Sequence, residues 1–378
     1  MSGYPISALL VIALMMLSCK KQESGPGPDW DAVKAGIKPI AAFPDEYGTP
    51  YRLEISNLGW EDGQYITRDG LTLYCFYTPM DLLAFAFLSD GEPDPCEVEP
   101  YLRGPFQEIL KEIPPVLDGV CDYFLSSDIL ISQRDSLTQP FPEWQISNIN
   151  FYATLDGAPQ VILNDTNPSQ ADYFVFTYLN PAPSAANENN DICLFRNTGR
   201  NPIGSFIHLP PPVNFPETSE DNPHLERLSD NELVLFFSSA DRPGGKGDTD
   251  IYFSLSHDAG DTWSEPEGVQ FNSPNFEDMP HLWQDSTGTY WMYYMDSENE
   301  ISKRRQTQAG NWKNWDAPIK VIRKGQAEAV GEPSLTQWGD IVFGLVYDAG
   351  TGWGTDKTNR FDDDTWVLPK KGSPLDTH

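Results

Sequence analysis

The stretch that decides the fold is EDNPHLERLSDNELVLFFSS at residues 220–239, which aligns with EDMPHLWQDSTGTYWMYYMDS at residues 277–297. Both units begin with Glu-Asp-x-Pro-His and run, past a polar turn, into a block of apolar and aromatic residues. EDGQYITRDGLTLYCFY from Glu61 follows the same plan, and GEPSLTQWGDIVFGLVY from Gly331 follows it more weakly. Self-similarity at a regular spacing indicates a repeat architecture.

The spacing of these units predicts a β-propeller. Pro223, Pro280 and Pro333 are 57 and 53 positions apart, which is long enough for the four short strands of a propeller blade. A fifth unit, DTNPSQADYFVFTYLNP from Asp165, keeps the Asn-Pro pair and the aromatic run. We therefore expect an all-β chain that forms a single propeller of about five blades, with six if the N-terminal segment contributes one.

Short apolar runs between clusters of turn residues predict strands, and helical patterns are rare. One exception is Pro105–Ile113, whose apolar residues recur at the spacing of one face of a two-turn helix. We place this helix in an insertion at residues 90–121 within the first blade, and the propeller itself at residues 46–372. The predicted strands are Leu71–Tyr77, Tyr173–Leu179, Leu233–Phe237, Asp250–Ser254, Tyr290–Met295 and Ile341–Tyr347.

The N-terminus resembles the export signal of a bacterial lipoprotein. Residues 8–17 (ALLVIALMML) are apolar but too short to span a bilayer, and Met-Leu-Ser-Cys ending at Cys19 is similar to a lipobox. We expect a signal peptide at residues 1–18, then a lipid-anchored flexible tether at residues 19–45. The expected location is the bacterial cell envelope, facing the periplasm or the exterior. Residues 1–18 lack Lys and Arg, so a cleaved soluble secretory protein is the alternative.

The composition excludes some partners. The net charge is −31 with a pI near 4.3, and the 25 Lys and Arg residues are scattered, so nucleic acid is not an expected partner. An acidic surface suits an exported protein, or one that binds neutral, cationic or Ca²⁺-bridged ligands. Export also permits disulfides. The four cysteines besides Cys19 allow three pairings, of which Cys96 with Cys121 is favoured because both flank the insertion.

Residues 233–282 resemble the WD40-like (PD40) repeat of TolB-type propellers. In that family a strand ending Phe-Ser-Ser leads to Asp-Arg-x-Gly-Gly, Asp-Ile-Tyr, Trp-Ser-Glu-Pro and Asn-Ser before the Pro of the next blade. The resemblance covers little more than one blade, and it implies a non-catalytic envelope propeller. The matching positions are Asp241, Arg242, Gly244, Gly245, Asp250, Ile251, Tyr252, Trp263, Ser264, Glu265, Pro266, Asn272, Ser273 and Pro280.

A second motif lies within that region. Ser256-x-Asp258-x-Gly260-x-Thr262-Trp263 resembles the Asp-box of sialidase-type (BNR) propellers. We expect Asp258 to accept backbone N–H bonds, Gly260 to supply a positive φ and Trp263 to pack between blades. The motif is structural in its family. Only one good copy exists and no FRIP-type arginine motif accompanies it, so a sialidase is disfavoured.

Candidate ligand groups lie at the start of each repeat unit. The innermost strand of a propeller blade lines a central channel, and ligands meet the loops at its mouth. If the units superpose, their acids and histidines converge and can bind a cation such as Ca²⁺, bind a sugar, or act as the paired carboxylates of a glycosidase. Alternatively, each acid only caps the turn that enters its strand. The candidates are Glu61, Asp62, Asp221, His224, Asp278, His281 and Glu332.

Two functions compete at this point. The TolB-type resemblance favours a non-catalytic binding or scaffold module for a protein or glycan ligand, attached to a membrane through the lipid on Cys19. The alternative is a carbohydrate-active hydrolase, by analogy with five-bladed glycosidases. No catalytic residue is assigned, and no cofactor is expected apart from Ca²⁺. The acidic runs at residues 90–99 and 362–364 lack the spacing of an EF-hand loop and are interpreted as solvated loops.

Overall fold

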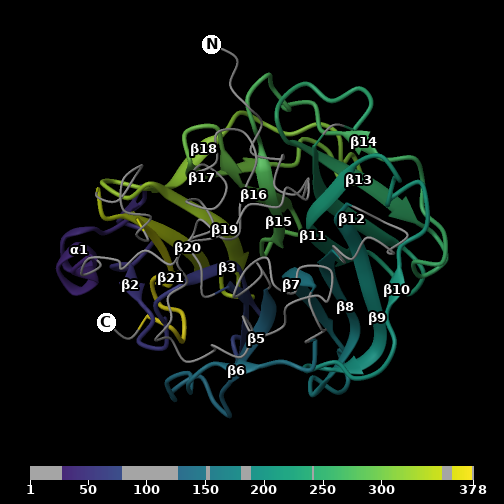
Figure 1. The fold of residues 1–378 in the computed structure, drawn as a ribbon. Coiled ribbons are helices and arrows are strands. Elements are labelled where there is room, and N and C mark those ends of the chain that lie inside the picture. The colour runs from purple at the N-terminus through teal and green to yellow at the C-terminus, as the bar shows by residue number, and fades with distance from the viewer. Residues whose placement is uncertain are drawn as a thin grey trace, which may run out of the picture.

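The strand that begins each repeat unit is the innermost strand of a blade. The computed structural model describes residues 28–78, 127–149, 154–179, 189–240, 242–350 and 360–376. In this part of the chain five blades surround a common axis (Figure 1), so the fold is an all-β, five-bladed propeller. The five innermost strands are β3 (Trp60–Ile66), β7 (Leu155–Leu163), β11 (Ser219–Arg227), β15 (Asp278–Gln284) and β19 (Ala329–Leu335).

The apolar runs of the sequence form the middle of each blade. The second strands are β4 (Thr72–Thr78), β8 (Gln170–Leu179), β12 (Leu233–Ala240), β16 (Tyr290–Asp296) and β20 (Ile341–Asp348). The third strands are β5 (Asp128–Gln133), β9 (Asp191–Gly199), β13 (Asp250–Ser256), β17 (Glu300–Arg305) and β21 (Phe361–Leu368). β12 is buried at every position, because neighbouring blades cover both of its faces, and a continuous apolar run is typical of such a strand.

The outermost strands are short, and the last blade takes its outermost strand from the N-terminus. Four blades end in β6 (Gln145–Ile146), β10 (Ile207–His208), β14 (Glu267–Gly268) and β18 (Ile319–Arg323). The fifth blade is completed by β2 (Tyr51–Arg52), which pairs with β21. β1 (Ile40–Ala41) adds a further strand to β18. The ring is therefore closed by segments from both ends of the chain.

The N-terminal segment corrects the predicted tether. Helix α1 (Trp30–Gly36) is capped by Asp29, whose carboxylate accepts the Ala32 N–H at 3.2 Å, and the chain then forms β1. Residues 30–41 are thus folded rather than a free linker. A seven-residue helix and a two-residue strand are too short to show a clear period in the sequence. Cys19 and the predicted signal peptide lie outside the described residues and stay predictions. Within the described residues, no helix is long and apolar enough to span a membrane.

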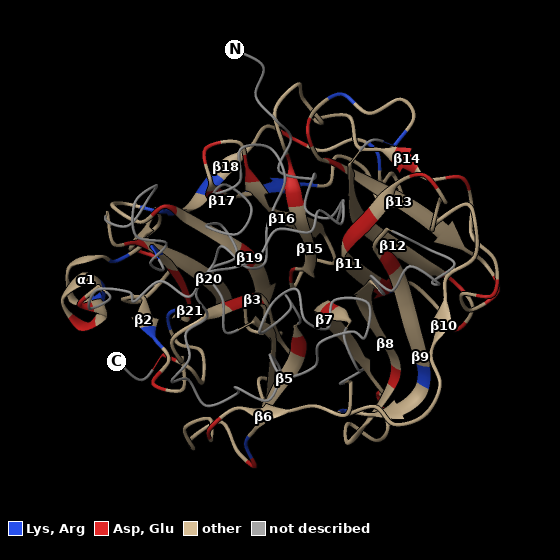
Figure 2. Ribbon diagram, in the orientation of Figure 1, with Lys and Arg blue, Asp and Glu red and all other residues tan. Residues whose placement is uncertain are grey.

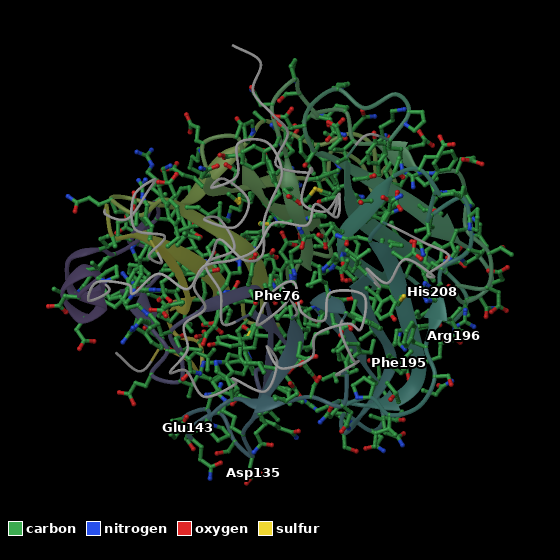
Figure 3. The ribbon with its side chains drawn as sticks, viewed as in Figure 1. Phe76, Asp135, Glu143, Phe195, Arg196 and His208 are labelled. Atoms are coloured by element: carbon green, nitrogen blue, oxygen red, sulfur yellow. The ribbon has the colours of Figure 1, made fainter. Side chains whose placement is uncertain are left out.

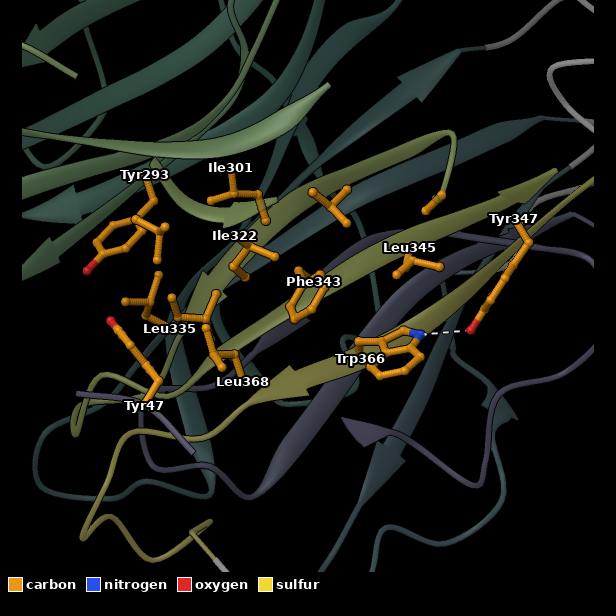
Figure 4. Close-up of a cluster of buried hydrophobic side chains, with 14 residues drawn as sticks. Tyr47, Tyr293, Ile301, Ile322, Leu335, Phe343, Leu345, Tyr347, Trp366 and Leu368 are labelled. Atoms are coloured by element: carbon orange, nitrogen blue, oxygen red, sulfur yellow. Dashed lines mark hydrogen bonds between the residues drawn. The ribbon is translucent and has the colours of Figure 1, made fainter. Parts of the chain in front are cut away.

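The core is divided among the interfaces between blades. Between the fourth and fifth blades, Phe343 and Leu345 of β20 pack with Tyr293 and Ile301, as Figure 4 shows. The Trp366 indole N–H donates to the Tyr347 hydroxyl at 2.9 Å in the same cluster. Each large apolar side chain buried in this way contributes about 1.5–3 kcal/mol to the free energy of folding.

The structure corrects two predictions made from the sequence. The unit predicted from Asp165 starts in the turn between β7 and β8, and the second blade instead begins at Asp156-Gly157-Ala158-Pro159. Its match to Glu-Asp-x-Pro-His is weak because only Asp156 and Pro159 keep the polar and proline character. The run at residues 362–364 lies in β21 and is buried, so it is not a solvated loop.

The cysteines and the predicted insertion fall mainly outside the described residues. Cys96, Cys121, the Pro105–Ile113 helix and the acidic run at residues 90–99 all belong to that part of the chain. Cys75 and Cys193 are described and are buried free thiols. Burial raises the pKa of both thiols, so they are poor nucleophiles.

The Asp-box forms a hydrogen-bonded turn at the end of β13. Asp258 accepts the Thr262 N–H at 2.8 Å and the Thr262 hydroxyl at 2.6 Å, while the Ser256 hydroxyl accepts the Gly260 N–H at 2.8 Å. Gly260 has φ +88°, a conformation that favours glycine. Trp263 packs in a cluster with β8, β9 and β12 residues. The motif therefore fastens the third blade to the second.

Candidate functional site

Each innermost strand carries a β-bulge near its start, where its pairing with the second strand shifts by one residue. The bulged residue has a positive φ in all five blades, although only the first blade uses glycine. Such backbone is strained for other residues, and bulges turn side chains in new directions beside functional sites. The bulged residues are Gly63 (φ 61°), Ala158 (φ 44°), Asn222 (φ 49°), Met279 (φ 58°) and Glu332 (φ 54°).

The bulges surround a cavity on the axis of the ring. Every innermost strand contributes to its lining, and its volume of about 30 Å³ has room for about two water molecules. The cavity is therefore a narrow channel, and a larger ligand meets the mouth rather than the interior. The lining runs from the bulges to the residues behind them, such as Gln64, Gln160, His224, His281 and Ser334.

Four carboxyl groups from four blades meet at this mouth. We call Asp62, Asp221, Asp278 and Glu332 the mouth acids; all four residues are partly buried. Asp62 and Glu332 are hydrogen-bonded to each other, and Glu332 also feels the charges of Asp278 and Asp221. Figure 2 shows acidic residues, in red, on β3 and β11 around the middle of the ring. The second blade contributes no mouth acid, because Gly157 and Ala158 occupy the equivalent positions.

Each mouth aspartate also caps its own bulge. The Oδ1 atoms of Asp62, Asp221 and Asp278 accept the N–H of the following residue at 2.9, 2.8 and 2.7 Å. The remaining contacts differ between blades. The Trp60 indole N–H donates to Asp62 at 2.9 Å, and the Thr177 hydroxyl donates to Asp221 at 2.8 Å. The two interpretations of the repeat acids are thus compatible, since one oxygen caps while the carboxyl group still faces the mouth.

Asn222 joins two blades at the mouth. Its backbone N–H binds Asp221, and its side-chain amide donates to Asp278 at 3.0 Å. Sequence reasoning missed this residue because it occupies the variable position of Glu-Asp-x-Pro. The signal that was available is the residue type, since Asn adopts positive φ more readily than most residues.

The glutamates of the repeat point away from the mouth, which corrects the placement of Glu61. Neighbouring residues of a strand face opposite sides, and Glu61, Glu220 and Glu277 are buried between blades. Glu61 accepts the Asn57 N–H at 2.6 Å, and Glu277 accepts the Ser273 N–H at 2.8 Å. Glu220 binds the Thr218 hydroxyl and the Arg242 guanidinium at 2.5 and 2.9 Å. These glutamates hold the loops that lead into each blade.

The mouth acids differ in proton affinity. Desolvation, with the charge of Asp62 next in size, raises the pKa of Glu332 well above its usual range. Desolvation, opposed by the Thr177 hydrogen bond and assisted by Asp278, raises the pKa of Asp221 to about 6. Burial also raises the pKa of Asp62. The mouth therefore combines a glutamic acid whose pKa is strongly raised with an aspartate whose pKa is raised to about 6.

His224 and His281 line the channel behind the mouth acids. Their ring centroids are 4.4 Å apart, and His281 Nε2 accepts the Leu335 N–H at 3.2 Å. Burial lowers the pKa of both imidazoles, so they are neutral at physiological pH. Further along the axis, Arg68 of the first blade forms an ion pair with Glu226 of the third. Among the described residues no group of three or more His, Cys, Asp or Glu side chains is arranged to hold a metal ion, so the Ca²⁺ expectation gains no support there.

The fold and this mouth define a five-bladed propeller with an acidic site at one end of its channel. No protein-family model matches the chain, and no curated protein matches it in sequence. Solved structures are similar in fold. A thermostable family-43 glycoside hydrolase is 12% identical, with a TM-score of 0.49 over 85% of this chain and 95% of the other.

Two further similar structures are also glycosidases. The catalytic domain of the Coprinopsis cinerea GH62 α-L-arabinofuranosidase is 9% identical, with a TM-score of 0.49 over 84% of this chain and 92% of its own. The Penicillium chrysogenum α-L-arabinanase is 10% identical, with a TM-score of 0.42 over 87% and 98%. At these identities the likeness is one of fold.

These findings correct two expectations. The TolB-type WD40-like assignment was wrong, because the similar structures are glycoside hydrolase propellers and no family model supports it. The residues behind it have local roles in the third blade: Arg242 pairs with Glu220, and Asp250 accepts the Gly247 N–H at 3.3 Å. The non-catalytic binding or scaffold interpretation is contradicted with it, since it depended on that family.

Proposed function

We propose that the protein is a carbohydrate-active hydrolase that cleaves uncharged glycans at the channel mouth. The observation that supports this proposal most is the cluster of carboxyl groups at the mouth, in which the pKa of Glu332 is strongly raised and that of Asp221 is raised to about 6. Glycoside hydrolysis needs one carboxylic acid to protonate the leaving oxygen and one carboxylate to act on a water molecule or on the sugar. Environments that separate the pKa values of neighbouring carboxyls assign these two roles.

The roles follow from the contacts of each group. Glu332 is the proton donor, because desolvation and the neighbouring carboxylates raise its pKa and its hydrogen bond to Asp62 fixes the carboxyl group. Asp221 is the carboxylate partner, held by Thr177 and by Asn190, whose side-chain amide donates to it at 3.3 Å. Its pKa of about 6 lies close to neutral pH, where general base catalysis is most effective.

The charge of the mouth restricts the substrate class. Two like charges 6 Å apart repel by about 3 kcal/mol at an effective dielectric constant near 20, and several carboxyls share this mouth. Sialic acids, uronic acids and sulfated sugars are therefore disfavoured, which agrees with the absence of a second Asp-box copy and of a FRIP-type motif. The similar structures described as an arabinofuranosidase and an arabinanase suggest neutral arabinans as the first substrates to test, and a similar structure described as a xylan β-1,4-xylosidase suggests xylans.

The test is a reducing-sugar assay on neutral arabinan and xylan, with polygalacturonate and sialyllactose as acidic comparisons. We expect hydrolysis of a neutral glycan. Its rate should rise near pH 6 as Asp221 ionises and should fall at higher pH as Glu332 loses its proton. Glu332→Gln and Asp221→Asn should each lower kcat by about 10²–10⁴-fold. Glu267→Gln, at an exposed position on the outermost strand of the third blade, is the matched control. A folded protein that cleaves no neutral glycan would contradict the proposal.

A further inference from the structure

One aromatic side chain departs from the burial pattern of its strand. Six of the seven residues of β4 are fully buried, and Phe76 alone is partly exposed. Phe76 lies opposite Asp62 in the β3–β4 ladder. Its backbone is therefore in the second strand of the blade, directly beside the strand that carries this mouth acid. Figure 3 shows Phe76 towards the centre of the ring, whereas Phe195 and His208 lie near its periphery.

A glycine of the second blade makes room for this ring. A Cβ atom added at Gly157 would lie 3.2 Å from Phe76 Cδ1, whereas one added at Gly63 would first meet the Ala158 backbone at 3.0 Å. Gly63 has a positive φ, but Gly157 does not, so backbone conformation does not account for the missing side chain at Gly157. Glycine at position 157 leaves space for the Phe76 ring, because the side chain of any larger residue would contact that ring too closely.

The glycine at position 157 also explains the shape of the acid cluster. The third and fourth blades place Asp221 and Asp278 where the second blade has Gly157. The acids consequently leave one sector of the mouth open, between the first and second blades. Phe76 occupies that sector, and Trp60, Phe361 and Met279 belong to the same apolar cluster.

An aromatic face beside hydrogen-bonding carboxyls matches the chemistry of a sugar ring. The C–H face of a sugar is apolar, while its hydroxyls need polar partners, and ligand sites combine apolar walls with a few placed polar groups in this way. We propose that Phe76 is the platform on which the glycan stacks while the mouth acids engage its hydroxyls and glycosidic oxygen. This inference rests on the proposed function, since it assigns the binding surface for the same neutral glycan.

Binding measured without turnover tests this assignment. Titration calorimetry of Glu332→Gln with xylotriose and arabinobiose gives the reference affinity. In that background we expect Phe76→Ala to raise Kd by about tenfold, the order of one aromatic contact. Phe76→Tyr should keep Kd within about threefold of the reference value. Gly157→Ala provides an independent variant, because its methyl group displaces the ring without changing any acid. Phe206→Ala, at an aromatic outside the mouth on the second blade, is the control.

The outcomes separate this inference from the proposed function. Weaker binding by Phe76→Ala and Gly157→Ala, with Phe206→Ala unchanged, supports the platform. Unchanged affinity in a folded Phe76→Ala variant overturns the platform and leaves the hydrolase proposal standing. Absence of both binding and hydrolysis for every neutral glycan in the wild-type protein overturns both.

Discussion

At the scale of single residues, one carboxyl group at the channel mouth serves the backbone and the site together. Asp278 Oδ1 accepts its neighbour's N–H and the side-chain amide of Asn222. Asp62 and Asp221 repeat the backbone contact in their own blades. A cap of this kind satisfies a backbone donor at the bulge, although the Met279 N–H also reaches the Ser238 hydroxyl at 3.2 Å. The repeat therefore keeps the aspartate for structural reasons, and its place on the axis makes it available for chemistry.

Two substitutions of Asp278 distinguish the contribution of the backbone cap to stability from that of the negative charge. Asp278→Ala removes the closer of the two acceptors of the Met279 N–H, so we expect the free energy of unfolding to fall by about 0.5–2 kcal/mol, as when a cap is lost. Asp278→Asn keeps a side-chain oxygen for the same N–H, so its stability should stay within about 0.5 kcal/mol of wild type. Chemical denaturation of both variants gives these values. Equal losses in the two would show that the negative charge, and not the cap, is what stabilises the bulge.

At the scale of elements, the seam between the first and fifth blades buries a run of three aspartates. β3 and β21 meet in parallel through one pair, Trp60 with Asp363, and single parallel bridges of the same kind join Ser127 to Leu155 and Thr249 to Phe276 at two other junctions between blades. Asp362, Asp363 and Asp364 of β21 are buried there. Asp362 accepts the Gly59 N–H at 2.7 Å. The titratable groups facing this seam are Glu61, Asp62, Cys75, Tyr77, Lys34, Arg52 and Tyr347.

The seam should make stability fall as pH rises. Desolvation, followed by the charge of Asp364, raises the pKa of Glu61 from 4.5 to about 8, and burial raises the pKa of Asp363. The folded state then binds these protons more tightly than the unfolded chain, so their contribution is complete below about pH 4.5 and is lost as pH rises towards 8.

Urea unfolding at pH 5 and pH 8 measures this difference. We expect Glu61→Gln to reduce the loss of unfolding free energy between pH 5 and pH 8, because Gln carries no titrating proton. Glu267→Gln, at an exposed position, should leave this loss unchanged. An equal decline in wild type and Glu61→Gln would show that Glu61 is already ionised in the folded state.

At the scale of the whole molecule, the N-terminal segment ties the fourth and fifth blades together. α1 places the Lys34 ammonium against Asp362 and Asp364, at 2.8 Å from Asp364 Oδ1, and Arg52 on β2 reaches Asp364 at 2.9 Å. These cations come from the start of the chain and their partners from its end. The charge of the buried aspartates is therefore compensated only when the N-terminal segment is docked.

Lys34→Met tests this dependence. The substitution keeps the apolar stem but leaves buried carboxylates with one cation fewer, so we expect a loss of about 3–5 kcal/mol in unfolding free energy. Lys313→Met removes an exposed partner of Glu267 and should cost less than about 1 kcal/mol. Thermal and chemical denaturation of the two variants give the comparison. Similar, small losses in both would mean that Asp362 and Asp364 are neutral without Lys34.

The membrane anchor is also a property of the whole chain, and it stays a prediction. If Cys19 carries a lipid, Cys19→Ala should move the protein from the membrane fraction to the soluble fraction of the cell. Unchanged fractionation would contradict the lipoprotein hypothesis. The proposed hydrolase activity does not depend on this result, because the mouth acids lie within the folded ring.

The sequence alone determined the features that depend on neighbours along the chain. The repeated Glu-Asp-x-Pro units and their aromatic runs predicted strands, and their spacing predicted a propeller of about five blades, because strand alternation and turn chemistry are local. Sequence also identified Asp62, Asp221, Asp278 and Glu332 as residues to examine. It misplaced the second blade, where Gly157 and Ala158 replace the polar residues of the repeat.

Only the tertiary structure decided which acid of each Glu-Asp pair faces the mouth. Strand alternation sends Glu61 and Asp62 to opposite sides, but the side that becomes the channel is set by how the blades assemble. The role of the N-terminal segment was equally hidden, since Lys34 and Asp364 are 330 positions apart. Contacts over such separations leave no periodic signal in a single sequence, and burial of the acids at residues 362–364 depends on them. The physical reason is that local patterns specify strands, whereas long-range packing determines which charges are buried, paired or exposed.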